Sequence, residues 1–153
     1  MNIGIIVYSR TGNTHSVALK LEEKLAAAGH AVTLERIEVG EVTPGKPVQF
    51  KTLPDAGPYD ALIFGAPVHG FSLCQPMAGY LKQVASLQGK KVACLVTQAF
   101  PYPWLGGNRA IRQMKQICES KGATVCGSGI VNWMNKRREQ QIVEVVDRLS
   151  KLF

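Results

Sequence analysis

The feature that most constrains the fold is the run Ser9-Arg10-Thr11-Gly12-Asn13-Thr14, which directly follows the apolar run from Ile3 to Tyr8. This order predicts a strand that turns into a helix through hydroxyl, amide and glycine residues. The first backbone N–H groups of a helix have no partner within it and carry the positive end of its dipole, so such a turn binds phosphate well. We therefore predict a phosphate site here. The alternative is that these residues only cap the helix.

The rest of the chain alternates between predicted strands and helices. Apolar residues at helical spacing follow the first strand, and Gly29 ends that helix. Further strands are predicted at residues 31–37, 59–65, 91–97 and 123–131, and further helices at 75–86, 107–121 and 136–152. Near-continuous apolar strands separated by helices are typical of a parallel sheet that is covered on both faces. We expect an α/β fold with a doubly wound, five-stranded parallel sheet.

One segment does not fit this alternation. Residues 38–58 are rich in proline and glycine and show no clear period. Because a structureless loop of this length is unusual in a compact domain, we expect a short or distorted helix there.

Length and cysteine content limit the class of protein. At 153 residues the chain suits one domain, residues 1–153, and no apolar run approaches the ~20 residues of a membrane span. It begins in a strand and not in a secretory leader, which favours the cytoplasm. The cysteines show neither C-x-x-C spacing nor companion histidines, so we expect no metal site and assign them to the core: Cys74, Cys94, Cys118 and Cys126.

Three loops are expected to converge where the parallel strands end: residues 9–14, 66–74 and 98–107. The second and third loops combine aromatic side chains with prolines and glycines. Aromatic faces stack on flat ligands, prolines lower the ordering cost of binding, and glycines allow close backbone approach. These loops therefore predict a site for a flat ring. The alternative is that the aromatic side chains only cover the end of the sheet.

With this phosphate loop and these two aromatic loops, the chain resembles the short-chain flavodoxins over essentially its whole length. The resemblance implies FMN as the cofactor and a backbone around Gly70 that responds to the oxidation state of the flavin. It implies no catalytic side chain and no metal. The implied cofactor-binding residues are Ser9, Arg10, Thr11, Gly12, Asn13 and Thr14 for the phosphate, and Pro67, Val68, His69, Gly70, Phe71, Thr97, Gln98, Phe100, Tyr102, Trp104, Gly106 and Gly107 around the ring. Spacing leaves open which of the three aromatic residues of the third loop stacks on the flavin.

The chain departs from the family pattern in its charge. Flavodoxins are usually acidic and often carry an acidic residue after the glycine of the second loop, whereas this chain has a net charge of +7 and Phe71 at that position. Positive charge near a reduced, anionic flavin lowers electrostatic repulsion, and Arg10 is the nearest candidate by sequence. His69 adds to this effect if it is protonated, and otherwise is a packing group. We assign no role to His15 or His30.

Three classes of function follow. We expect an FMN-containing electron carrier between redox partner proteins. The basic runs are interpreted first as solvated faces, and the alternative is that they attract partners with acidic surfaces. The first alternative is an FMN-dependent oxidoreductase that uses NADH or NADPH to reduce a quinone or another small acceptor. The second is a flavin-less interaction or regulatory domain on the same scaffold. Nucleic acid is not expected, because the aromatic residues are not interleaved with the lysines and arginines. The oligomeric state is left open.

Overall fold

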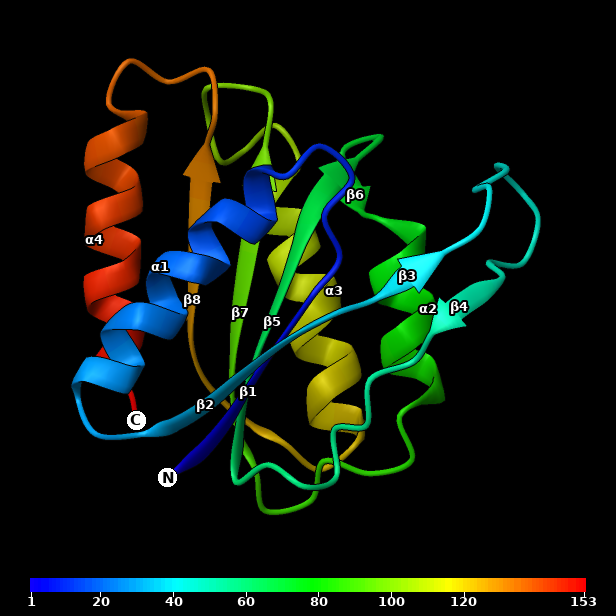
Figure 1. Cartoon of the computed structure of the whole chain (residues 1–153). Coiled ribbons are helices and arrows are strands. Elements are labelled where there is room, and N and C mark those ends of the chain that lie inside the picture. Colours follow the sequence, from blue (N-terminus) through cyan, green and yellow to red (C-terminus); the bar gives the residue numbers. More distant parts are fainter.

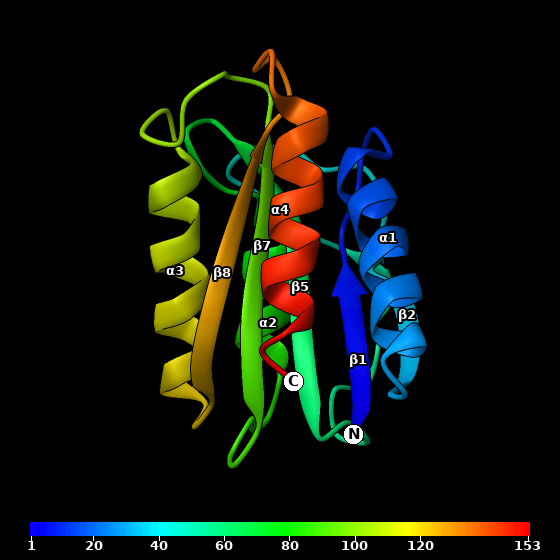
Figure 2. The same cartoon turned by 90° about the vertical axis from the view of Figure 1, so that its left-hand side faces the viewer.

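The computed structural model describes all 153 residues and has a central parallel sheet covered by helices on both faces (Figures 1 and 2). The five parallel strands lie in the order β2-β1-β5-β7-β8. Their bounds are β1 (Asn2–Val7), β2 (Ala31–Arg36), β5 (Ala61–His69), β7 (Lys91–Gln98) and β8 (Thr124–Asn132). The predicted doubly wound α/β fold is thus confirmed.

Two helices cover each face of the sheet. The helices α1 (Asn13–Ala27) and α4 (Arg138–Ser150) pack on one face, and α2 (Gln75–Gln83) and α3 (Gly107–Ser120) pack on the other. Neighbouring residues of β1 enter different cores, Ile5 under α1 and α4 and Ile6 under α2 and α3. Because both faces are buried in the middle of the sheet, the central strands β1, β5 and β7 are mostly apolar, whereas the edge strand β2 is not buried. None of the four helices has the length and apolar character that a membrane span requires.

The segment 38–58 contains no helix, so the expectation of one was wrong. It forms two short antiparallel strands, β3 (Glu38–Val39) and β4 (Phe50–Thr52). Prolines that recur every few residues remove the N–H groups that a helix needs. The segment is instead held by α2, since Phe50 packs against Gly79 and the Tyr80 hydroxyl donates to the Pro54 carbonyl.

Two further differences concern the predicted strands and core. The strand expected to end at residue 65 continues to His69 and pairs with the short strand β6 (Ser72–Leu73), so most of the loop 66–74 is a hairpin. Of the four cysteines assigned to the core, Cys126 is only half-buried, and its Sγ donates to the Val92 carbonyl at 3.4 Å. All the loops expected to form the site leave the carboxyl ends of the strands, at the top of Figure 1, and both chain termini lie at the other end.

Candidate functional site

The three loops expected to form a site meet at the carboxyl end of the sheet. Thr14 and Thr97 join the first and third loops through a buried hydroxyl–hydroxyl hydrogen bond of 2.7 Å. Phe71 of the β5–β6 hairpin stacks on Phe100 of the third loop, with ring centroids 5.2 Å apart and planes 6° from parallel. The geometry therefore places the candidate site residues in one neighbourhood.

The loop 9–14 leaves backbone donors free. Gly12 is the N-cap of α1, has a φ of 92° and provides no side-chain cap. The Ser9 Oγ accepts hydrogen bonds from the N–H groups of Gly12 and His15, at 3.1 and 3.2 Å, which leaves its own O–H as a donor. The N–H groups of Thr11, Asn13 and Thr14 donate to no atom of the chain. These amides at the positive end of a helix dipole are suited to an anion.

Three polar candidates point into the protein instead. The Thr14 and Thr97 hydroxyls are bonded to each other, with either one as the donor, and both side chains are buried. Gln98 is 3% exposed, and its Nε2 donates to the Tyr102 carbonyl and to Asn132 Oδ1. The side chains of Thr97 and Gln98 thus hold the third loop in place.

The turn of the β5–β6 hairpin has an unusual backbone. His69 pairs with Ser72, and the two residues between them, Gly70 and Phe71, have φ angles of 58° and 62°. Positive φ at both central residues matches the primed turn that hairpins prefer. Phe71 is the only residue other than glycine with a positive φ, which costs about 1–2 kcal/mol. The turn is therefore locally strained at a position next to the third loop.

The third loop packs closely on this hairpin and exposes its aromatic side chains. Gly106, the N-cap of α3, has a φ of 116°, and a Cβ there would lie 2.8 Å from the Phe71 Cα and from Val68 Cγ1. Only glycine fits that approach. Tyr102 and Trp104 stack on each other at 5.7 Å and are 51% and 70% exposed. Gly107 starts α3 and is buried. That one of these aromatic residues stacks on a flavin stays a prediction.

A cavity of about 730 Å³ lies on the other side of the hairpin. It is bounded by Tyr8, Arg10 and His69 and by the segment 40–44. Partial burial, with a smaller contribution from the Arg10 guanidinium, lowers the pKa of His69 below its usual range. His69 is therefore neutral at pH 7, and the protonated form that we considered from the sequence is not favoured.

Sequence reasoning missed two groups of residues. The first group is the segment 40–44, which lies in the stretch 38–58 where a short or distorted helix was expected. A long aperiodic stretch is itself a signal of functional loops. The second group supports the third loop. Asn132, at the carboxyl end of β8, accepts from Gln98 Nε2 at 2.5 Å and donates through its N–H to Gln141 Oε1 at 2.9 Å. A polar residue that ends an apolar strand could have pointed to Asn132.

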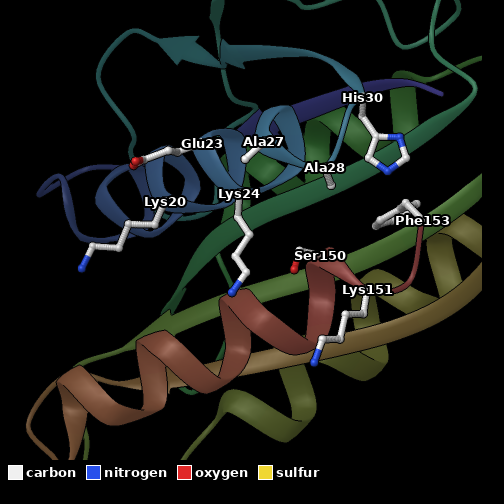
Figure 3. A pocket seen from close by; sticks show the side chains of 9 residues that line it. All are labelled: Lys20, Glu23, Lys24, Ala27, Ala28, His30, Ser150, Lys151 and Phe153. Carbon is white, nitrogen blue, oxygen red and sulfur yellow. The ribbon is translucent and has the colours of Figure 1, made fainter.

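A second hollow lies far from these loops. A groove of about 860 Å³ runs between the carboxyl-terminal turns of α1 and α4 (Figure 3). Asp147 accepts from Lys24 at 2.9 Å and pairs with Lys151 at 3.0 Å. The cations at these helix ends also stabilise the helix dipoles. This structural explanation accounts for Lys24 and Lys151, and the groove lies far from the loops expected to bind a ligand, so it is not our candidate site.

The residues at the carboxyl end of the sheet fit FMN. The free N–H groups of Thr11, Asn13 and Thr14 match a terminal phosphate, which needs several donors at one place. The aromatic side chains of the hairpin and the third loop match a flat ring. The backbone amides and the aromatic side chains together thus meet the requirements of both ends of the cofactor.

Comparisons with known proteins agree with this interpretation. A family model described as Flavodoxin matches residues 5–144. A curated flavodoxin from Megasphaera elsdenii is 31% identical over 137 residues, which is 86% of this chain and 87% of the relative. The oxidised flavodoxin 2 of Bacillus cereus superposes with a TM-score of 0.72 at 21% identity and full coverage of both chains. A flavoprotein from Lactobacillus acidophilus NCFM, solved in complex with FMN, superposes with a TM-score of 0.66 at 17% identity, covering 94% of this chain and 97% of that one.

Proposed function

Because the chain belongs to the flavodoxin family and FMN is its cofactor, we propose that residues 1–153 form one FMN-binding domain that carries electrons between redox proteins. FMN accepts and releases electrons when bound, and the protein supplies binding, orientation and access. We also propose that the protein works in the cytoplasm. All four cysteines are free, as is usual in a reducing compartment.

In this proposal the amides of Thr11, Asn13 and Thr14 bind the phosphate, together with the Ser9 hydroxyl. These donors are preorganised, because Ser9 Oγ already fixes the loop through Gly12 and His15. Arg10 and Gly12 belong to the same phosphate loop. The residues around the ring come from the other two loops. Pro67, Val68, His69, Gly70 and Phe71 lie on one side of it, and the loop from Phe100 to Gly107 lies on the other.

The observation that carries the proposal is an exposed apolar rim beside exposed cations. Phe71, Phe100 and Met134 are 51%, 42% and 71% exposed. Tyr102 and Trp104 are also exposed. Exposed apolar clusters of this kind are typical of protein interaction sites. The basic residues Lys136 and Arg137 begin two positions after Met134 and are exposed.

The structure ties this basic segment to the rim. The Met134 N–H donates to the Ala99 carbonyl at 3.1 Å, and Asn135 Nδ2 donates to the Pro101 carbonyl at 3.0 Å. Charge on a rim chiefly sets the rate at which partners meet. The proposed partner is therefore a redox protein with an acidic surface.

The test measures electron transfer from the reduced, FMN-loaded protein to two cytochromes of matched potential, one acidic and one basic. We expect faster transfer to the acidic cytochrome, with a rate that falls as ionic strength rises. The double substitution Lys136→Glu and Arg137→Glu should slow transfer about tenfold at low salt. The control is Lys20→Glu, an exposed lysine at the groove between α1 and α4, which should leave the rate unchanged.

Other outcomes contradict the carrier role. Equal rates with both cytochromes at every ionic strength would remove the acidic partner. Steady turnover of NADPH with a quinone, without any partner protein, would favour the oxidoreductase. Purified protein that retains no FMN would favour the interaction domain.

A further inference from the structure

The cavity beside the β5–β6 hairpin holds polar side chains, of which Tyr8 and Glu41 have no part in the proposed cofactor site. We propose that this cavity is a second ligand site, which binds a small monocarboxylate with an apolar body beside the flavin site. The inference goes beyond the proposed function, because it depends on the cavity and not on the cofactor.

Three hydrogen-bonding side chains line the cavity without a partner. Arg10 forms none of the ion pairs of the structure. The Tyr8 hydroxyl and the His69 ring nitrogens also form no hydrogen bond. Since Gln98 Oε1 is the one fully buried side-chain oxygen or nitrogen without a partner, the polar atoms of Tyr8 and His69 are not fully buried, and a ligand in the cavity can reach them. The rings of Tyr8 and His69 meet edge to face at 6.4 Å, which keeps these two groups on one wall.

The charge states of these groups favour an anion that accepts hydrogen bonds. Burial raises the pKa of Tyr8 and lowers the pKa of His69, and the Arg10 guanidinium acts on both groups from nearby. At pH 7 Tyr8 is thus a hydroxyl donor, and His69 is a neutral ring with one N–H. Arg10 presents a planar fork of donors that matches a carboxylate better than any other common anion except phosphate.

The remaining walls select a monoanion with an apolar body. Val42, Pro44 and Leu73 provide apolar surface, and Glu41 places a carboxylate on the same cavity. With one cation and one anion in the walls, a phosphate dianion meets more repulsion than a monocarboxylate does. A volume of about 730 Å³ lies within the ~300–1,000 Å³ that small-molecule sites occupy.

The experiment titrates FMN-loaded protein with benzoate and follows the backbone amides by NMR, with flavin absorption as a second signal. We expect saturable shifts at Glu41, Val42 and Gly70. Benzamide, which has the same shape but no charge, should bind about tenfold more weakly because it cannot form the charged pair with Arg10. Inorganic phosphate is the third probe and should bind more weakly than benzoate.

Variants locate the site. Val42→Trp should fill the cavity and abolish the benzoate shifts, whereas Val143→Trp, on α4 at a side chain that is 64% exposed, should not change them. Arg10→Gln should remove the preference for benzoate over benzamide. The wild-type comparison of the two probes still tests the proposal if a variant does not fold.

Three results would overturn the inference. These are the absence of saturable shifts, equal affinities for benzoate and benzamide, or tighter binding of phosphate. A fourth arm uses apoprotein: if FMN displaces benzoate, the cavity belongs to the cofactor site. Retention of FMN is measured separately by absorption, so a failure of the carrier function and a failure of this site are distinguishable.

Discussion

The groove between α1 and α4 and the cavity beside the β5–β6 hairpin have similar volumes, about 860 and 730 Å³, but they use their polar groups differently. Two lysines that line the groove, Lys24 and Lys151, are already paired with Asp147. At the carboxyl end of the sheet, backbone amides and the Arg10 side chain have no partner in the chain. Volume therefore does not distinguish these regions, whereas free backbone amides gathered at the start of a helix do.

The largest expected effect tests the free amides of the loop 9–14. Each hydrogen bond to a charged group contributes about 1.5–3 kcal/mol, so loss of three such bonds to the phosphate should weaken binding by at least about 4.5 kcal/mol, or more than about a thousandfold. Calorimetry of apoprotein with FMN and with riboflavin measures this difference. Lys151→Ala, in the groove, should leave both affinities unchanged. Equal affinities for the two flavins would show that the amides do not bind the phosphate.

The next effect compares two glycines of positive φ, one at each end of the molecule. A Cβ at Gly106 meets Phe71 and Val68 at 2.8 Å, whereas a Cβ at Gly29, with a φ of 94°, meets no atom within 4 Å. Gly106→Ala should lower the free energy of unfolding by about 2–4 kcal/mol, because strain and overpacking add. Gly29→Ala should cost only about 1 kcal/mol of strain. Urea unfolding checks both, and equal costs would mean that the third loop moves away from the hairpin without penalty.

A smaller effect separates the strain at Phe71 from its stacking. Phe71→Gly removes a positive φ that costs about 1–2 kcal/mol and also removes an aromatic contact with Phe100 of about 0.5–1.5 kcal/mol. When Phe100 is present, the lost contact offsets part of the relieved strain, so the gain in stability should be small. In a Phe100→Ala background there is no contact to lose, and the gain should be larger. A double-mutant cycle by thermal unfolding measures the difference. Additive effects would show that the two rings do not stabilise each other.

The smallest effects concern pH, and the two regions should respond in different ranges. The pKa of His69 is lower in the folded protein than in the unfolded chain. As the pH drops below about 6.5, the unfolded chain therefore takes up a proton at His69 more readily than the folded protein does, and the free energy of unfolding falls. Asp147 also has a lowered pKa, chiefly because Lys24 hydrogen bonds to it, and its contribution is present above about pH 3.8 and lost as the pH falls further. Urea unfolding between pH 3 and pH 8 checks both ranges. His69→Gln should flatten the upper range only, and Asp147→Asn the lower range only.

Local pattern was enough to predict the sheet and the helices. Apolar strands such as residues 91–97 and helices that end at a glycine depend on nearby residues, which the sequence displays directly. The segment 38–58 could not be predicted in this way, since its two short strands depend on contacts between Phe50 and Gly79 and between Tyr80 and Pro54.

The candidate site was only partly predictable for the same reason. The order of Ser9 to Thr14 indicates free amides at a helix start, which is a local property. The neutral state of His69 and the mutual stacking of Tyr102 and Trp104 depend on neighbours that are brought together only by folding. The roles of these residues toward FMN stay predictions.

The strained hairpin that joins β5 to β6 separates two spaces. Its Phe71 side packs on Gly106 and Phe100, and its Gly70 side lines the cavity with Arg10. A ligand that favours one arrangement of this turn changes the free energy of binding on the other side. By thermodynamic linkage this effect is reciprocal. If bound FMN changes the affinity of the cavity for its ligand by some factor, that ligand changes the affinity for FMN by the same factor.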